Sequence, residues 1–126
     1  MDARFFALLG GIYGFLSVAA GAFGAHALRG KLSAEMLAIF ETAARYQMYH
    51  AIVLLVIAFA LSRGSNGALV WSGIFFSAGV LIFSGSLYIL TLSGIKAWGA
   101  VTPIGGLLLL LGWASLIAGL TKTFSR

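Results

Sequence analysis

Apolar residues occur in four long runs along the chain, and short polar connections separate them. A helix needs about 20 apolar residues to cross a hydrocarbon core of roughly 30 Å, and each run is that long. The pattern therefore predicts an all-α integral membrane protein, an up-down bundle of four transmembrane helices that forms a single domain over residues 1–126. The predicted helices cover about residues 5–28, 34–62, 68–92 and 99–121.

The second run is too long to lie wholly within the hydrocarbon. A continuous helix over residues 34–61 would rise about 42 Å at roughly 1.5 Å per residue. Ser33 precedes this helix in the N-cap position, and Glu35 stands in the first turn, where the helix dipole favours an anion. Polar and apolar residues occupy opposite arcs of the first turns. We therefore expect an interfacial amphipathic extension at the start of helix two.

Small residues recur at regular steps along the first and fourth runs. In a membrane, such a stripe lets a neighbouring helix approach closely. The residues predicted to mediate helix packing are Gly10, Gly14, Ser17, Gly21, Gly105, Gly112 and Gly119.

The only proline, Pro103, lies near the start of the fourth run. A helix start is the favoured interpretation, with Thr102 as the cap and Pro103 at the first helical position. A kink in a helix that begins near Ala97 is the alternative.

The composition narrows the class of protein. The chain is 61% hydrophobic and only 9% charged, whereas soluble domains carry about 25% charged residues. The net charge of +5 comes from Lys and Arg residues spread over the connections, which favours anchoring against anionic lipid over nucleic-acid binding. The chain has no cysteine, so thiolate chemistry is excluded. No cofactor motif is present, and we expect neither a cofactor nor a metal.

Four passes place both termini on the same side of the membrane. If Arg45 lies at membrane depth, the count of Lys and Arg residues on the two sides favours cytoplasmic termini by four to three. The first run exceeds the roughly 7 to 15 residues of a signal-peptide core. We therefore expect it to be retained as a membrane helix.

Four motifs together resemble one known family. They are FGAHAL at residues 23–28, ARYQMYHA at 44–51, FSGSLYIL at 83–90 and TPIGGLLLLLGW at 102–113. In this order they resemble the YgdD/YwdK family of small bacterial membrane proteins (domain of unknown function 423, uncharacterised family UPF0382), which is related to eukaryotic transmembrane protein 256. The resemblance implies a multi-pass four-helix protein of the bacterial plasma (inner) membrane. It supplies no reaction, substrate or catalytic residue.

The up-down topology brings polar residues from all four helices toward one membrane face. Polar groups at membrane depth are costly unless they are paired or face the bundle interior, so they are candidates for function. Three interpretations stay open, namely hydrogen-bonded ties between helices, a ligand or proton site, and a metal site. The candidate polar cluster is His26, Glu41, Arg45, Gln47, His50, Ser84, Ser86, Tyr88 and Thr102.

Helix two carries most of the ionisable members. Glu41 and Arg45 are four residues apart and can form an ion pair on one helix face. Gln47 and His50 fall on the apolar arc and point inward. We expect His50 to be buried, neutral and hydrogen-bonded to a group on helix one, three or four, for example His26, because burial disfavours the charged ring.

No acid, base and nucleophile stand together at a recognisable spacing, so we expect no enzyme. The leading hypothesis is a non-enzymatic membrane component that binds membrane lipid or a membrane-protein partner, or forms a homo-oligomer, and supports envelope integrity. A small transporter or channel for protons, ions or small solutes is the alternative, motivated by the intramembrane His and Arg residues. Aromatic residues such as Tyr13 and Trp113 are predicted to be interface anchors or packing residues.

Overall fold

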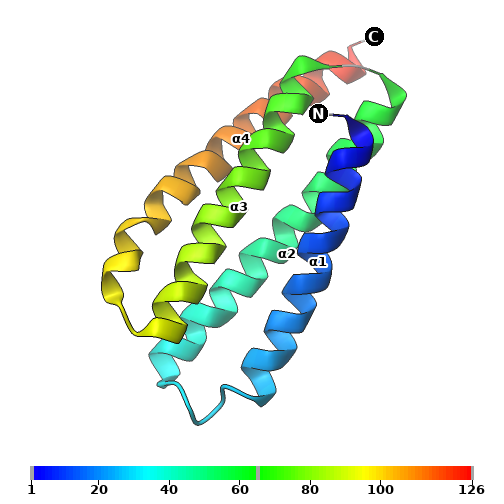
Figure 1. Ribbon diagram of the computed structural model, residues 1–126. Helices are drawn as coiled ribbons and strands as arrows, with labels where there is room; N and C mark the ends of the chain where they lie inside the picture. The colour runs from blue at the N-terminus through cyan, green and yellow to red at the C-terminus, as the bar shows by residue number, and fades with distance from the viewer. Residues whose placement is uncertain (1, 65, 126) are drawn as a thin grey trace.

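The computed structural model describes residues 2–64 and 66–125. Its helices run alternately up and down, and both termini lie at the same end of the bundle (Figure 1). Counting the short 3-10 helix η1 with α4, four helices are long and apolar enough to cross a membrane, which confirms the predicted fold class. The elements are α1 (Ala3–His26), α2 (Ala34–Arg63), α3 (Gly67–Ser93), η1 (Lys96–Ala100) and α4 (Thr102–Phe124).

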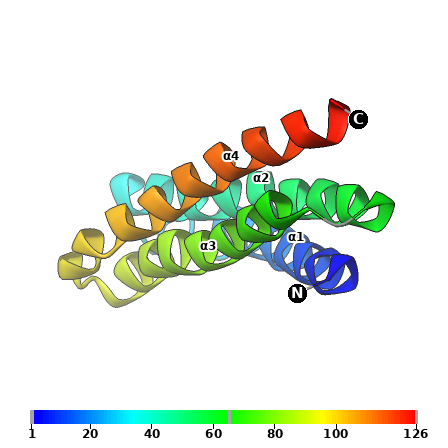
Figure 2. The same ribbon diagram turned by 90° about the horizontal axis from the view of Figure 1, so that it is seen from above.

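Each helix packs mainly against the next helix in the chain, so α2 and α3 form the centre of the bundle. Figure 2 shows α4 crossing α3 at an angle. Long side chains make the remaining connections. Phe6 of α1 reaches Gly73 of α3, and Trp113 of α4 reaches His50 of α2.

Side chains and glycine define the helix ends. Ser33 Oγ accepts a hydrogen bond of 3.1 Å from the N–H of Met36, which confirms the predicted cap of α2. Asn66 caps α3, and its Nδ2 also donates 2.8 Å to the carbonyl of Gly119 near the end of α4. At the end of α3, Gly94 adopts the left-handed conformation with φ 74°, which favours glycine.

The start of α4 differs from the predicted one. Val101 occupies the cap position without a side-chain hydrogen bond, while Thr102 is the first helical residue, so the cap assigned to Thr102 was wrong. Its hydroxyl lies 2.6 Å from Ser86 Oγ on α3 instead. Because the chain enters α4 through η1, Pro103 lies in the first turn of a new helix, as the favoured interpretation predicted. The alternative, a kink within a longer helix, was wrong.

α2 is longer than a hydrocarbon core. Its 30 residues rise about 45 Å, against a core of roughly 30 Å. In its first turns Glu35 and Glu41 are exposed, while Phe40 is buried against Tyr88 and Phe23. This distribution is that of the expected amphipathic extension.

Two of the largest core side chains, both phenylalanine rings, pack directly against glycines of a neighbouring helix. Phe6 and Phe76 are fully buried. A Cβ atom on Gly73 would lie 2.5 Å from the Phe6 ring, and one on Gly112 would lie 2.7 Å from the Phe76 ring. Because real Cβ atoms essentially never approach so closely, these two contacts require glycine and hold α1, α3 and α4 together.

Candidate functional site

A chain of hydrogen bonds through Gln47 joins three helices. Tyr88 of α3 donates from its hydroxyl to Gln47 Oε1 over 2.8 Å, and Gln47 Nε2 donates to the backbone carbonyl of Tyr13 on α1 over 2.9 Å. Tyr13 in turn donates from its hydroxyl to the carbonyl of Ser77 on α3 over 2.8 Å. Both ends of the buried Gln47 amide are thereby satisfied, so this residue acts as a tie between α1, α2 and α3.

His50 is 4% exposed and uses both ring nitrogens. Trp113 Nε1 lies 3.2 Å from His50 Nε2, and His50 Nδ1 lies 2.6 Å from the carbonyl of Tyr46. An indole N–H can only donate and a carbonyl can only accept. Nε2 is therefore an acceptor, the proton is on Nδ1, and the ring is neutral. Phe76 and Trp113 enclose this ring.

Serine hydroxyls hold α2 from both sides. Ser17 of α1 donates to the carbonyl of Ala44 over 2.6 Å, and Ser84 of α3 donates to the adjacent carbonyl of Ala43 over 2.7 Å. On the other side of α3, Ser72 donates to a carbonyl of α4 over 2.8 Å. Within the part of the chain that the structure describes, no buried side-chain polar atom lacks a partner.

The charged members of the predicted cluster lie outside this network. His26, the last residue of α1, is exposed, so the expected tie between His26 and His50 was wrong. Glu41 and Arg45 are also exposed and line a hollow on the outer face of α1 and α2. Among the described residues no ion pair within 4.0 Å joins them. Six members of the predicted cluster therefore form hydrogen bonds between helices, in separate groups and not in one site, whereas His26, Glu41 and Arg45 form none among the described residues. The six are Gln47, His50, Ser84, Ser86, Tyr88 and Thr102.

The predicted packing residues also divide into two groups. A Cβ atom on Gly10 would lie 2.9 Å from the Ala51 carbonyl oxygen, and one on Gly119 would lie 2.6 Å from the Leu69 side chain. At Gly105 it would collide with the backbone nitrogen of Phe83. These positions, with Ser17 and Gly112, are at close helix contacts.

Gly14 and Gly21 lie in more open surroundings than predicted. A Cβ atom on Gly14 would make an ordinary contact of 3.8 Å with Ala51, and no atom would lie within 4 Å of one on Gly21. The regular spacing of small residues along α1 therefore does not mark a close helix contact at these two positions. Both glycines line hollows on the outer surface instead.

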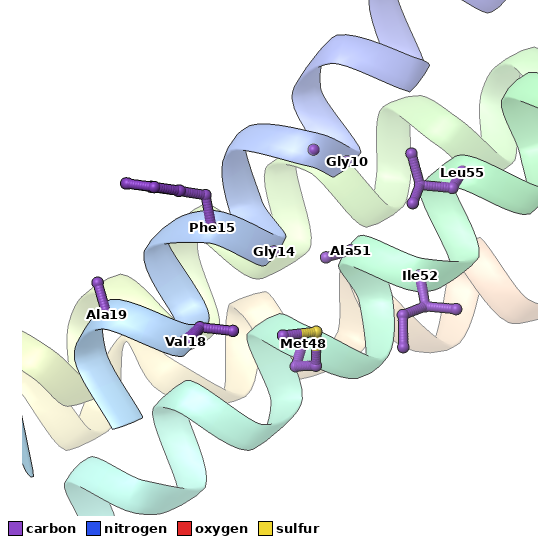
Figure 3. Close-up of a pocket in the computed structure, with 10 residues that line it drawn as sticks. Gly10, Gly14, Phe15, Val18, Ala19, Met48, Ala51, Ile52 and Leu55 are labelled. Atoms are coloured by element: carbon purple, nitrogen blue, oxygen red, sulfur yellow. The ribbon is translucent and has the colours of Figure 1, made fainter. Parts of the chain in front are cut away.

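Two adjoining hollows follow the seam between α1 and α2. The first has a volume of about 520 Å³ and is almost wholly apolar, and Gly10, Gly11 and Gly14 are among the residues that line it on α1. Phe15 and Val18 of α1 and Met48, Ile52 and Leu55 of α2 also line it. Figure 3 shows Val18 and Met48 directed toward one another between the two helices, while Phe15 extends from α1 away from α2. The second, of about 300 Å³, shares Met48 with the first and contains Ser17, Gly21, Glu41, Ala44, Arg45 and Tyr49. We call these two hollows together the α1–α2 groove.

A separate apolar groove of about 500 Å³ lies between α2 and α4, lined by His50, Phe83 and Trp113 among others. The sequence singled out neither groove, because their walls depend on which helices are neighbours. It also missed the polar roles of Tyr13 and Trp113, which were predicted as anchors or packing residues. Their only distinguishing signal was a hydrogen-bonding group within a long apolar run.

Four helices that are long and apolar enough to cross a membrane identify this chain as a small integral membrane protein. A family model described as a protein of unknown function (DUF423) matches residues 20–106. The chain belongs to this family, which confirms the resemblance found in its motifs. No solved structure gives a significant match.

Relatives align over nearly the whole chain. A UPF0382 membrane protein of Staphylococcus aureus (strain bovine RF122 / ET3-1) is 44% identical over 119 residues, which cover 94% of this chain and 97% of the relative. A UPF0382 membrane protein of Staphylococcus haemolyticus (strain JCSC1435) is 45% identical with the same coverage. The UPF0382 inner membrane protein YgdD of Escherichia coli (strain K12) is 40% identical over 119 residues, covering 94% of this chain and 91% of the relative. This chain is accordingly a multi-pass membrane protein.

Proposed function

We propose that this protein is a non-enzymatic component of the plasma membrane that binds membrane lipid in the α1–α2 groove and supports envelope integrity. The observation that carries the proposal is the groove itself. Its apolar part opens sideways on the helix surface, where acyl chains lie, and its other part contains Glu41 and Arg45. An apolar trough that ends at charged side chains matches the two chemical parts of a phospholipid.

The internal polar residues support a structural role for the rest of the bundle. Gln47 bonds α1 and α3 through both of its polar atoms. His50 bonds Trp113 of α4 through Nε2 and the Tyr46 carbonyl of its own helix through Nδ1, so both side chains have all their polar atoms engaged. A general acid or base must reach a substrate proton, and an ion path needs polar groups that face water or the ion. Side chains already bonded to one another favour a rigid scaffold over an enzyme, and over a channel for protons or ions.

Lipid that remains bound during purification tests the proposal. We expect protein isolated from native membranes in mild detergent to retain phospholipid after extensive washing. Removal of the gene should then sensitise cells to detergents, and the wild-type chain should restore resistance. Protein that retains no lipid, or a deletion strain with an unchanged envelope, would contradict the proposal. Proteoliposomes that leak protons or ions only when they contain the protein would favour the transporter or channel instead.

We also propose that both termini face the cytoplasm, since four Lys and Arg residues stand on that side against three on the other when Arg45, which lies within α2, is left out of the count. A reporter fused after the last residue tests this orientation. Alkaline phosphatase is expected to be inactive there and green fluorescent protein to be fluorescent, and the reverse pattern would place the termini outside.

A further inference from the structure

We infer that the α1–α2 groove selects a phospholipid whose head group carries both a phosphate and a primary ammonium, as in phosphatidylethanolamine. This inference rests on the proposed lipid binding and adds the identity of the head group. Its basis is the placement of Glu41 and Arg45 at the polar end of an apolar groove that leads away from them along α1 and α2.

The depth of Arg45 matches the head-group layer. Arg45 and Arg63 are both exposed and lie eighteen positions apart on α2, which corresponds to about 27 Å along the helix. A hydrocarbon core is roughly 30 Å thick. Arg63 is the last residue of α2 and so marks the opposite surface in this placement. Arg45 is then level with the lipid phosphates on the side where α1 and α2 are connected.

The length of the groove matches one leaflet. From Arg45 the lining residues continue along α2 to Leu55, a distance of about 15 Å. Half of a hydrocarbon core is also roughly 15 Å. On the α1 side, Gly10 is packed against Ala51, whereas Gly11 and Gly14 carry no side chain that would fill the space beside the helix. An acyl chain can therefore lie close to α1 at these two positions. One chain can therefore extend from the head-group layer to the middle of the bilayer.

The two charges fit a zwitterion in order as well as in sign. Arg45 is one helical turn deeper than Glu41, and the phosphate of phosphatidylethanolamine is likewise deeper than its ammonium. A guanidinium binds phosphate through paired hydrogen bonds, and the Glu41 carboxylate can accept from the primary ammonium. The carboxylate would oppose an anionic head group, and the quaternary ammonium of phosphatidylcholine has no N–H to donate.

Native mass spectrometry of the delipidated protein with equal amounts of phosphatidylethanolamine, phosphatidylglycerol and phosphatidylcholine tests the selection. We expect the wild type to retain the ethanolamine lipid at least about tenfold over each of the others, as one additional hydrogen bond between charged groups provides. Glu41→Gln should abolish the preference and keep lipid binding, whereas Arg45→Gln should weaken binding of all three lipids. Arg63→Gln, at the other end of α2, is the matched control and should behave as the wild type.

A second pair of variants tests the acyl-chain part of the groove. Both Gly11 and Gly85 are helical, and a Cβ atom on either would meet no atom within 4 Å, so leucine is accommodated at both positions. Gly11 lines the groove and Gly85 does not. Gly11→Leu should reduce retention of every lipid about tenfold, because its side chain occupies the space of the acyl chain, while Gly85→Leu should leave retention unchanged.

Different outcomes contradict lipid binding in the groove and selection of the ethanolamine head group. Equal retention of the glycerol and ethanolamine lipids by the wild type, or an ethanolamine preference that survives in Glu41→Gln, would overturn the head-group inference and leave lipid binding intact. A wild type that retains no lipid would overturn both. Both would also be overturned if the delipidated wild type were a dimer and Gly11→Leu dissociated it, because a second copy of the chain would then occupy the groove.

Discussion

Trp113 on α4 donates a hydrogen bond from Nε1 to Nε2 of His50 on α2, over 3.2 Å. This bond joins two helices that are not consecutive in the chain. It is compatible only with a neutral imidazole, since a protonated Nε2 would direct its hydrogen at the indole N–H.

The first prediction concerns the protonation state of His50. In protein with ¹⁵N-labelled histidine, reconstituted in lipid near neutral pH, we expect the His50 signals of a neutral ring protonated on Nδ1. Trp113→Phe should keep this tautomer, because the Tyr46 carbonyl still accepts from Nδ1, and should cost about 1 kcal/mol of stability for the lost bond. A ring protonated on both nitrogens would contradict the hydrogen-bond assignment.

Removal of the imidazole separates a structural from a binding role. His50→Leu should destabilise the bundle by about 1–2 kcal/mol, because two hydrogen bonds of a buried side chain disappear. Thermal unfolding in detergent measures the loss. If stability stays unchanged while the envelope phenotype disappears, His50 is a binding residue and its structural role is refuted.

The second prediction is that Gln47 and Tyr88 stabilise the protein as a pair. Gln47→Leu leaves the Tyr88 hydroxyl without its partner and should cost about 1–3 kcal/mol, whereas Tyr88→Phe removes that hydroxyl. The double variant should therefore be less destabilised than the sum of the two single variants. Unfolding free energies of all four proteins form the cycle, and strictly additive effects would show that the bond contributes nothing.

The third prediction concerns Gly112. Gly112→Leu should disrupt the bundle, because its Cβ atom alone would lie 2.7 Å from the Phe76 ring. Overpacking of a close contact costs about 1–3 kcal/mol and at times more. Gly85→Leu is the control, since its Cβ atom meets open space. Equal melting temperatures of the two variants in detergent would mean that Gly112 faces lipid.

The fourth prediction is a small effect at the serines that bind α2. Ser17→Ala and Ser84→Ala each remove one donor to a backbone carbonyl. Such bonds contribute on average only about 0.6 kcal/mol in membrane bundles. Because the two serines approach α2 from different helices, their effects should add to about 1 kcal/mol in the double alanine variant. A loss above 3 kcal/mol from either single change would contradict independent ties.

Run length and capping chemistry made the fold predictable from the sequence. The four apolar runs are long enough to span a bilayer, and Ser33 has the side chain that caps a helix, so the elements follow from local features. The hydroxyl of Thr102 was misassigned because its partner, Ser86, comes from another helix. Local sequence cannot say which of two available acceptors or donors a hydroxyl will use.

The candidate site could be predicted only in part. The spacing of residues determines which face of a helix they share, but not which other helix packs against that face. Gly112 and Gly21 occur in similar small-residue stripes, yet only Gly112 meets another helix closely. In Figure 1, α1 and α2 separate toward their connection, which leaves Gly21 at an open hollow. Helical periodicity likewise predicted that His50 faces inward, but its bond to Trp113 depends on how α4 crosses the bundle.

Site-resolved photo-crosslinking tests lipid binding in the α1–α2 groove most directly. Protein reconstituted with phosphatidylethanolamine that carries a diazirine in one acyl chain is irradiated, digested and mapped by mass spectrometry. We predict that crosslinks concentrate on Phe15, Val18, Met48 and Ile52, which surround the groove, and that Gly11→Leu reduces them while Gly85→Leu does not. Crosslinks spread evenly over exposed residues of all four helices, such as Leu81 and Leu107, would contradict a defined lipid site.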